Sequence, residues 1–141
     1  VVAVPLDFAS QAAPNGELAP NLAKQGIRLQ RIVAPDATMT FFNMEDPVIG
    51  GYTPERVALR RAIGLATQIE REIQTVRRGQ AIAAQAMLPP HTYGYEAALR
   101  SEAGLYDPAR AKALLDLYGY TDRDGDGWRE QPDGSPLTLR L

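Results

Sequence analysis

Apolar residues recur at spacings of three and four between Pro54 and Arg78, and this spacing predicts amphipathic helix. The apolar face consists of Leu59, Ala62, Ile63, Ala66, Ile69, Ile73 and Val76, and the charged face of Arg60, Arg61, Glu70, Arg71, Glu72, Arg77 and Arg78. The mixed signs are typical of a helix face exposed to solvent. The pattern fits either one helix or two in succession, with a left-handed stop at Gly79.

A shorter helix is predicted from Asp107 to Tyr118, and Gly119 ends it. Both helical segments begin with proline after a residue whose side chain can cap free amides, in the pairs Thr53-Pro54 and Asp107-Pro108. The fixed φ and the missing N–H of proline suit the first helical position. The sequence therefore marks both helix starts. A shorter helix-prone run from Phe8 to Ala13 is ended by Pro14-Asn15-Gly16.

Alternation of apolar and polar residues predicts strands from Ile27 to Val33 and from Thr38 to Met44. The segments Gly127–Gln131 and Leu137–Leu141 have the pattern of a β-hairpin. Together, the helices and strands predict an α+β fold in which a mixed β-sheet packs against amphipathic helices.

The composition excludes several classes of protein. The chain has 141 residues, a usual size for one domain, and its 45% hydrophobic content is enough for a core. The net charge of −2 offers no basic surface for nucleic acid, and cysteine is absent. No apolar run approaches the roughly 20 residues that span a bilayer. The last segment alternates like a strand without a closing turn, so we expect the chain to be part of a longer protein.

No arrangement of residues typical of an enzyme is found. His91 is the only histidine, which rules out a two-histidine metal site. Ser10, Ser101 and Ser135 lie in no Gly-x-Ser-x-Gly elbow, and the glycines form no phosphate-binding loop. We therefore expect a protein without catalytic activity and without a required cofactor.

Acidic residues between Asp122 and Asp133 follow the spacing of an EF-hand calcium loop. The residues at positions one, three, five, seven, nine and twelve are Asp122, Asp124, Asp126, Trp128 through its backbone carbonyl, Glu130 and Asp133. The loop departs from the pattern because aspartate replaces the bidentate glutamate at position twelve, and a strand-like segment follows it. Two interpretations stay open: a calcium site, or an Asp/Gly turn whose side chains bond their own backbone.

Several short motifs, taken in order, resemble one protein family. They are Phe42-Asn43-Met44 with Asp46-Pro47, Arg56-Val57-x-Leu59-Arg60-Arg61-Ala62-Ile63, Gly79-Gln80-Ala81, Leu88-Pro89-Pro90, Gly94-Tyr95, and a run from Tyr106-Asp107-Pro108 to Gly119-Tyr120. Over residues 38–141, their order and spacing resemble the family 5 extracellular solute-binding proteins of ABC transporters, the group of dipeptide- and oligopeptide-binding proteins.

The resemblance implies part of a type II periplasmic-binding-protein-like fold, in which residues 1–141 form a single domain, a fragment of the second lobe. It also implies a periplasmic or extracellular protein that captures peptides or similar small solutes and delivers them to a membrane permease. Asn43, His91, Tyr93 and Tyr95 are then expected near the ligand cleft. The alternative is a calcium-binding module that uses the loop from Asp122 to Asp133.

Overall fold

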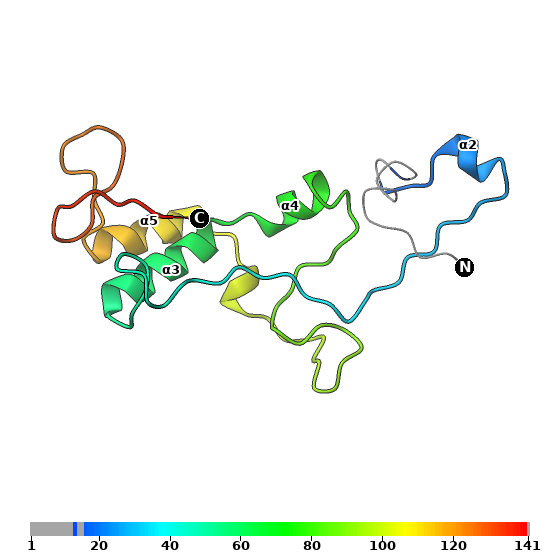
Figure 1. Cartoon of the computed structure of the whole chain (residues 1–141), viewed down its shortest axis with the longest axis horizontal. Coiled ribbons are helices and arrows are strands. Elements are labelled where there is room, and N and C mark those ends of the chain that lie inside the picture. Colours follow the sequence, from blue (N-terminus) through cyan, green and yellow to red (C-terminus); the bar gives the residue numbers. More distant parts are fainter. Residues whose placement is uncertain (1–12, 14–15, 141) are drawn as a thin grey trace. The chain divides into compact units, whose positions relative to one another are not determined.

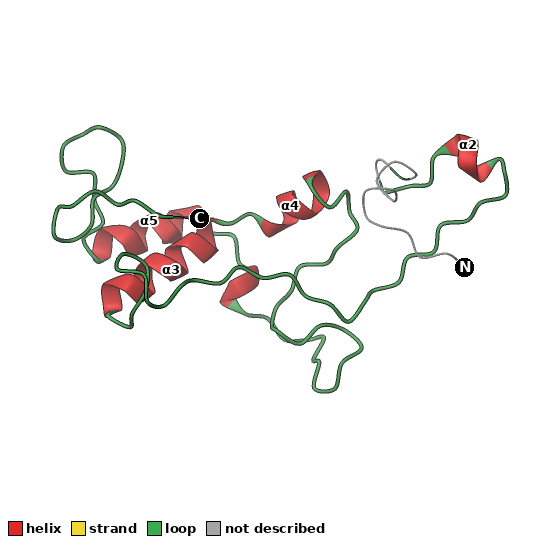
Figure 2. Cartoon of the chain, in the orientation of Figure 1, coloured by secondary structure: helices red, strands yellow, loops and turns green. Residues whose placement is uncertain are grey.

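A computed structural model describes Ala13 and residues 16–140 (Figure 1). Most of the predicted run from Phe8 to Ala13, and Leu141 of the predicted hairpin, lie outside the described residues. No helix in the described part of the chain has the length and apolar character needed to cross a membrane. Figures 1 and 2 show the helices, which are α2 (Pro20–Ala23), α3 (Pro54–Ala66), α4 (Ile69–Thr75), the 3-10 helix η1 (Glu102–Gly104) and α5 (Pro108–Leu117).

The chain divides into two compact units, and each is described by itself. The first, here called the α2–α4 unit, comprises Val1–Ala37 and Gln68–Leu99. The second, the α3–α5 unit, comprises Thr38–Thr67 and Arg100–Leu141 and also contains η1. The expectation of a single domain over residues 1–141 stays a prediction.

Small side chains allow α3 and α5 to pack closely. Ala62 and Leu65 of α3 and Ala111 of α5 form a buried cluster, with Leu114 and Leu115 packed against it. Alanine adds little to the radius of a helix, so the two backbones can approach each other closely. The core of the α3–α5 unit therefore lies at this helix pair, and the other buried residues described in the unit are Gly50, Ala58, Leu59 and Tyr120.

The predicted helical segment from Pro54 to Arg78 forms two helices, which separate at Thr67. The backbone of Thr67 is extended, with ψ 115°, and its hydroxyl donates to the carbonyl of Ile63 at 2.8 Å. A β-branched residue that bonds the preceding turn in this way favours the end of a helix. No residue of α4 is buried, and Val76 is exposed, so the prediction that the apolar face extends to Val76 is wrong.

Helix α5 begins and ends as the sequence predicts. The carboxylate of Asp107 accepts a hydrogen bond from an amide of the first turn at 2.9 Å. The Asp107 N–H itself donates to the carbonyl of Leu65 at 2.8 Å. At the other end, Gly119 has φ +81° and the Tyr120 N–H donates to the carbonyl of Leu115 at 3.0 Å, which is the Schellman arrangement.

The cap predicted at Thr53 is not formed. Thr53 makes no capping hydrogen bond to the first turn of α3. Its hydroxyl bonds the carboxylate of Glu55 instead, and this bond, after the one from the backbone N–H of Glu55 itself, lowers the pKa of that carboxyl. The Thr53 hydroxyl therefore acts as a donor to Glu55, whereas capping would require its oxygen to accept from an amide of the first turn.

The predicted mixed β-sheet is not observed in the described residues. Neither segment Ile27–Val33 nor segment Thr38–Met44 is a strand, and the side chains of Ile32 and Phe41 are 81% and 77% exposed. A strand needs the N–H and carbonyl groups of a neighbouring strand, and the described residues supply no such neighbour for these segments. The predicted hairpin is reduced to one antiparallel bridge between Glu130 and Pro136.

A charged fork joins η1 to both packed helices. The carboxylate of Glu102 accepts hydrogen bonds from Arg61 of α3 at 2.9 Å and from Arg110 of α5 at 2.6 Å. The Arg61 hydrogen bond is the main cause that lowers the pKa of Glu102. All three side chains are partly exposed, so the fork contributes little to stability compared with the buried cluster.

Replacing Gly64 by alanine is expected to stabilise the chain by about 0.5–1 kcal/mol, because alanine favours helix more than glycine does. A Cβ at Gly64 meets no atom within 4 Å. As a control, Gly119→Ala is expected to destabilise the chain by about 1–2 kcal/mol, because a side chain in the left-handed region clashes with the backbone. Urea unfolding followed by helical circular dichroism measures both changes. A lower free energy of unfolding for Gly64→Ala would contradict the finding that a Cβ at Gly64 meets no neighbouring atom.

Candidate functional site

The loop from Asn43 to Gly51, here called the Asn43 loop, is shaped by Asp46. Its carboxylate oxygen Oδ1 accepts hydrogen bonds from the N–H groups of Val48 at 2.8 Å and Ile49 at 3.0 Å. The bonds from Ile49 and Val48 favour the charged carboxylate and lower the pKa of Asp46. Asp46 therefore holds the turn as an anion.

The other side of the Asn43 loop is closed by two glycines. The N–H of Gly50 donates to the carbonyl of Asp46 at 2.9 Å, and the N–H of Gly51 donates to the carbonyl of Met44 at 2.8 Å. A Cβ on Gly50 would lie 2.4 Å from the Met44 oxygen and 2.5 Å from the Asp46 oxygen. The close approach of backbone to backbone therefore admits only glycine at position 50.

Two arginines of α3 hold the loop from outside. Arg56 donates to the carbonyls of Pro47 at 2.6 Å and Gly50 at 3.3 Å. Arg60 donates to the carbonyl of Ile49 at 2.6 Å. The two arginines are four residues apart, so they lie on one face of α3. The loop is therefore attached to a packed helix through three charge-assisted hydrogen bonds.

The carboxamide of Asn43 is oriented by the backbone that follows it. The N–H of Glu45 donates to Oδ1 of Asn43 at 3.0 Å. Since an N–H donor requires an acceptor, this bond identifies the oxygen of the carboxamide and leaves the Nδ2 amino group on its other side. Asn43 is exposed, so it offers a hydrogen-bond donor in a fixed orientation.

The sequence did not predict the role of these arginines. It assigned Arg60 to the solvent-exposed charged face, whereas both Arg56 and Arg60 are half-buried and bonded to loop carbonyls. The only signal in the sequence is their spacing of four residues directly after a loop rich in glycine, proline and aspartate. That signal does not separate a helix surface exposed to water from one that carries a loop.

The predicted cleft residues His91, Tyr93 and Tyr95 belong to the α2–α4 unit, where they lie on one turn. His91 has φ +68°, a left-handed conformation that is uncommon for residues other than glycine. The turn is closed by the Thr92 hydroxyl, which donates to the carbonyl of Pro89 at 2.6 Å. All three predicted side chains are exposed, so they are accessible to a solute.

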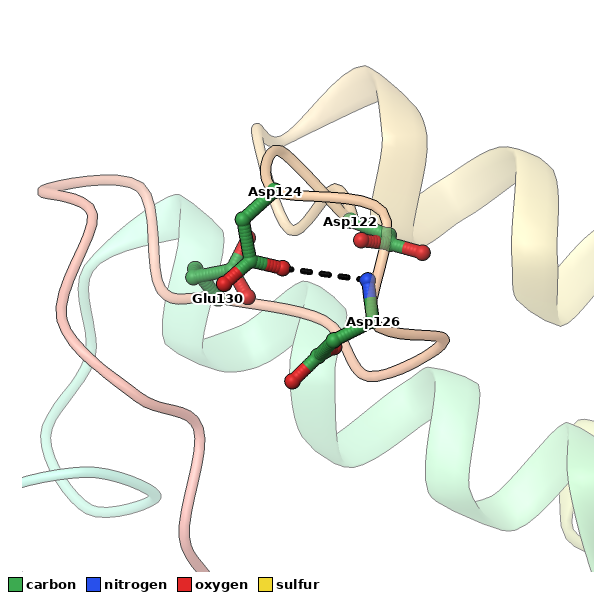
Figure 3. A group of neighbouring side chains, drawn as sticks. All are labelled: Asp122, Asp124, Asp126 and Glu130. Atoms are coloured by element: carbon green, nitrogen blue, oxygen red, sulfur yellow. Dashed lines mark hydrogen bonds between the residues drawn. The ribbon is translucent and has the colours of Figure 1, made fainter.

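Four carboxylates gather in the loop that follows α5 (Figure 3). One oxygen of each lies within 4.8 Å of an oxygen of every other, and the four residues are Asp122, Asp124, Asp126 and Glu130. Four negative charges at this distance repel one another and attract a cation. The structure therefore brings together four of the six residues of the predicted calcium loop.

Backbone N–H groups already use some of the acceptor lone pairs of these carboxylates. Asp122 accepts from the N–H groups of Gly125 at 2.7 Å and Gly127 at 3.0 Å. Asp124 accepts from the N–H of Asp126 at 3.2 Å, which is the dashed line in Figure 3. Such bonds are typical of an Asp-rich turn, and each carboxylate retains further lone pairs for a cation.

The other two predicted calcium-loop residues do not add carboxylate oxygens to this group. Asp133 accepts from the hydroxyl of Ser135 at 2.7 Å and from its N–H at 2.9 Å, and these bonds lower the pKa of Asp133. The side chain of Trp128 is 77% exposed, and its N–H donates to Asp126 at 2.7 Å. A contribution from the Trp128 carbonyl stays a prediction.

An open cavity of ≈ 410 Å³ adjoins the acidic loop. Its lining includes three of the four grouped acids and the exposed ring of Trp128, and it continues along residues 136–138. Carboxylates beside an aromatic ring favour a cationic group over an anionic one. Arg129 also lines the cavity and pairs with Asp116, so the three acids exceed the one cation in the lining.

A known protein family matches nearly all of the chain. The family is described as bacterial extracellular solute-binding proteins, family 5 Middle, and the match covers residues 6–141. No curated protein matches the chain.

Three solved structures from two bacteria are similar to this chain. An oligopeptide ABC transporter, periplasmic oligopeptide-binding protein from Thermotoga maritima is 26% identical over 99% of this chain and 29% of its own, with a TM-score of 0.58. Its mannohexaose-bound structure is 30% identical over 61% and 16%, with a TM-score of 0.46. NikA from Brucella suis in complex with Fe(III)-EDTA is 33% identical over 57% and 16%, with a TM-score of 0.48. The chain therefore spans less than a third of each structure, and the first likeness supports a periplasmic-binding-protein-like fold.

We expect the carboxyl of Asp46 to titrate below 3.8, its ordinary pKa, because two backbone N–H groups stabilise the anion. The stability that Asp46 contributes is then complete above that value and is lost as the pH falls through the lower pKa of the folded state. The amide chemical shifts of Val48 and Ile49, followed by NMR during acidification, measure the midpoint. Asp46→Asn serves as the control that removes the transition. A midpoint at or above 3.8 would contradict the two hydrogen bonds.

Proposed function

Since the chain belongs to family 5 of the bacterial extracellular solute-binding proteins, we propose that it forms part of the substrate-binding component of an ABC-type importer. The family match over residues 6–141 is the observation that carries this proposal. The chain covers 29% of the Thermotoga protein. We infer that residues 1–141 form a single domain, a fragment of the second lobe of a longer solute-binding protein.

The proposed solutes are peptides or similar small molecules. The Thermotoga protein that matches 99% of this chain is named as a periplasmic oligopeptide-binding protein. By analogy, this protein works in the periplasm or outside the cell and delivers its solute to a membrane permease. Such a protein binds and releases its solute without chemical change, so it needs neither a catalytic residue nor a cofactor.

We propose that Asn43 and the turn with His91, Tyr93 and Tyr95 contact the captured solute. Asn43 supplies a hydrogen-bond donor whose orientation is set by the Glu45 N–H. The exposed tyrosines supply rings with an apolar face and a polar hydroxyl, which suit contacts with varied solutes.

Tri-alanine is a suitable probe for the function, because it presents peptide groups without large side chains. We expect the full-length protein that contains this chain to bind it, and Asn43→Ala to weaken the affinity about two- to tenfold, the range for one neutral hydrogen bond. Isothermal titration calorimetry gives both values. Asn21→Ala on α2 is the matched control, since Asn21 is also an exposed asparagine.

The isolated 141-residue chain is expected to show no saturable binding of tri-alanine at micromolar concentration, because the proposed site needs the rest of the protein. Micromolar binding by the isolated chain would contradict the proposal that it is only part of a lobe.

A calcium-binding module is a second candidate function, and the four carboxylates within 4.8 Å of one another favour it. In this proposal Asp122, Asp124, Asp126 and Glu130 supply side-chain oxygens, and Trp128 supplies its backbone carbonyl. Oxygen ligands in a flexible loop suit Ca²⁺, which accepts irregular geometry more readily than Mg²⁺ does.

Calcium bound only to the folded chain raises its melting temperature. We expect a higher melting temperature with millimolar calcium than with a chelator, and a smaller rise in Asp124→Asn. Asp36→Asn is the matched control, because Asp36 is an exposed aspartate outside the predicted calcium loop. Equal melting temperatures with calcium and with chelator would exclude a stabilising calcium site.

A further inference from the structure

We infer that Arg56 and Arg60 are positioning residues for solute binding, which act through the Asn43 loop. The inference rests on the proposed solute-binding function and adds two points to it. One is which residues fix the binding loop, and the other is which atom of the solute Asn43 recognises.

The hydrogen bonds within the Asn43 loop are complete on the donor side. Each N–H from Glu45 to Gly51 has an acceptor inside the loop, and Pro47 has no N–H to satisfy. The loop therefore has a defined shape of its own. The backbone from Glu45 to Gly51 therefore has no spare N–H with which to bond the carbonyls or carboxylates of α3.

Attachment depends on the carbonyls that the loop leaves free. The carbonyls of Pro47, Ile49 and Gly50 accept only from the guanidinium groups of α3, within the described part of the chain. Both arginines lie on the helix that packs against α5, so the loop is attached to an element of the buried core. Without them, water takes these carbonyls and the loop loses its fixed position on the helix.

The direction of the Asn43 carboxamide identifies the atom it binds. Oδ1 is occupied by the Glu45 N–H, and in the described residues Nδ2 has no hydrogen-bond partner. The free group is therefore a donor of two hydrogens. It fits an acceptor oxygen of the solute, such as the carbonyl of a peptide group, and it does not fit an ammonium.

The two arginines differ in the number of loop carbonyls they bond, so lysine is expected to substitute for one better than for the other. Arg56 reaches two carbonyls with separate nitrogens, Nη1 and Nη2, whereas Arg60 reaches one with Nη1. A lysine ammonium is a single compact donor group, so it can replace one contact more readily than a pair of separated ones. Arg60→Lys should therefore preserve the loop better than Arg56→Lys does.

Amide hydrogen exchange in the full-length protein tests the attachment. Arg56→Gln and Arg60→Gln are expected to speed the exchange of the Ile49, Gly50 and Gly51 amides about tenfold or more, with partial rescue by Arg60→Lys. Arg61→Gln is the matched control on the same helix, because it breaks the Glu102 fork and leaves the loop carbonyls bonded. Unchanged exchange in both glutamine variants would overturn the inference.

A double-mutant cycle tests whether the attachment serves binding. Tri-alanine affinity is measured for the wild type, Asn43→Ala, Arg60→Gln and the double variant. We expect Arg60→Gln to weaken binding about two- to tenfold and to add little once Asn43 is removed. Fully additive effects, or no effect of Arg60→Gln, would overturn a positioning role even if exchange accelerates. Absence of binding by the wild type would overturn the proposed function itself, and the binding role of the arginines with it.

Discussion

The close packing of α3 against α5 is the constraint on which the rest of the α3–α5 unit depends. Ala62 and Ala111 leave room for the two helices to approach, and Leu65 is buried with them. At this separation the Asp107 N–H reaches the Leu65 carbonyl at 2.8 Å, so the start of α5 is tied to the end of α3. A larger side chain at either alanine would force the helices apart and break this bond as well. The hydrogen bond between the helices therefore depends on the same small core residues that allow the helices to pack.

Helix α3 uses different faces for different tasks. The face with Ala58 and Ala62 is buried, whereas Arg56 and Arg60 project toward the Asn43 loop. The loop therefore takes its position from a helix that is already held by its core. A binding group is positioned most accurately when the element beneath it is rigid, which explains why a polar side chain on a loop can still be well oriented.

The features that the sequence predicted correctly depend on residues that are adjacent in the sequence. The proline start and Gly119 end of α5 depend on a few adjacent residues, and so do the turns that the Asp122 carboxylate makes with its own backbone. The segment from Ile27 to Val33 failed as a strand because its pattern describes a side-chain alternation but supplies no pairing partner. Arg60 was wrongly predicted to face solvent for a related reason. Its acceptor is the backbone carbonyl of Ile49, and every residue has such a carbonyl, so no sequence pattern identifies it.

The two groups proposed to contact the solute differ in how much order they have before binding. Asn43 lies on a loop whose amides are paired and whose carbonyls are held by a packed helix. His91 and Tyr93 lie on a turn in a unit where α4 contributes no buried residue, and His91 itself has the costly φ of +68°. In the proposed function, binding at the turn orders exposed side chains, whereas binding at Asn43 uses a side chain that is already hydrogen-bonded to the Glu45 N–H. In the proposed function, the selective hydrogen bond then comes from Asn43, and the adaptable contacts with varied solutes come from the tyrosines.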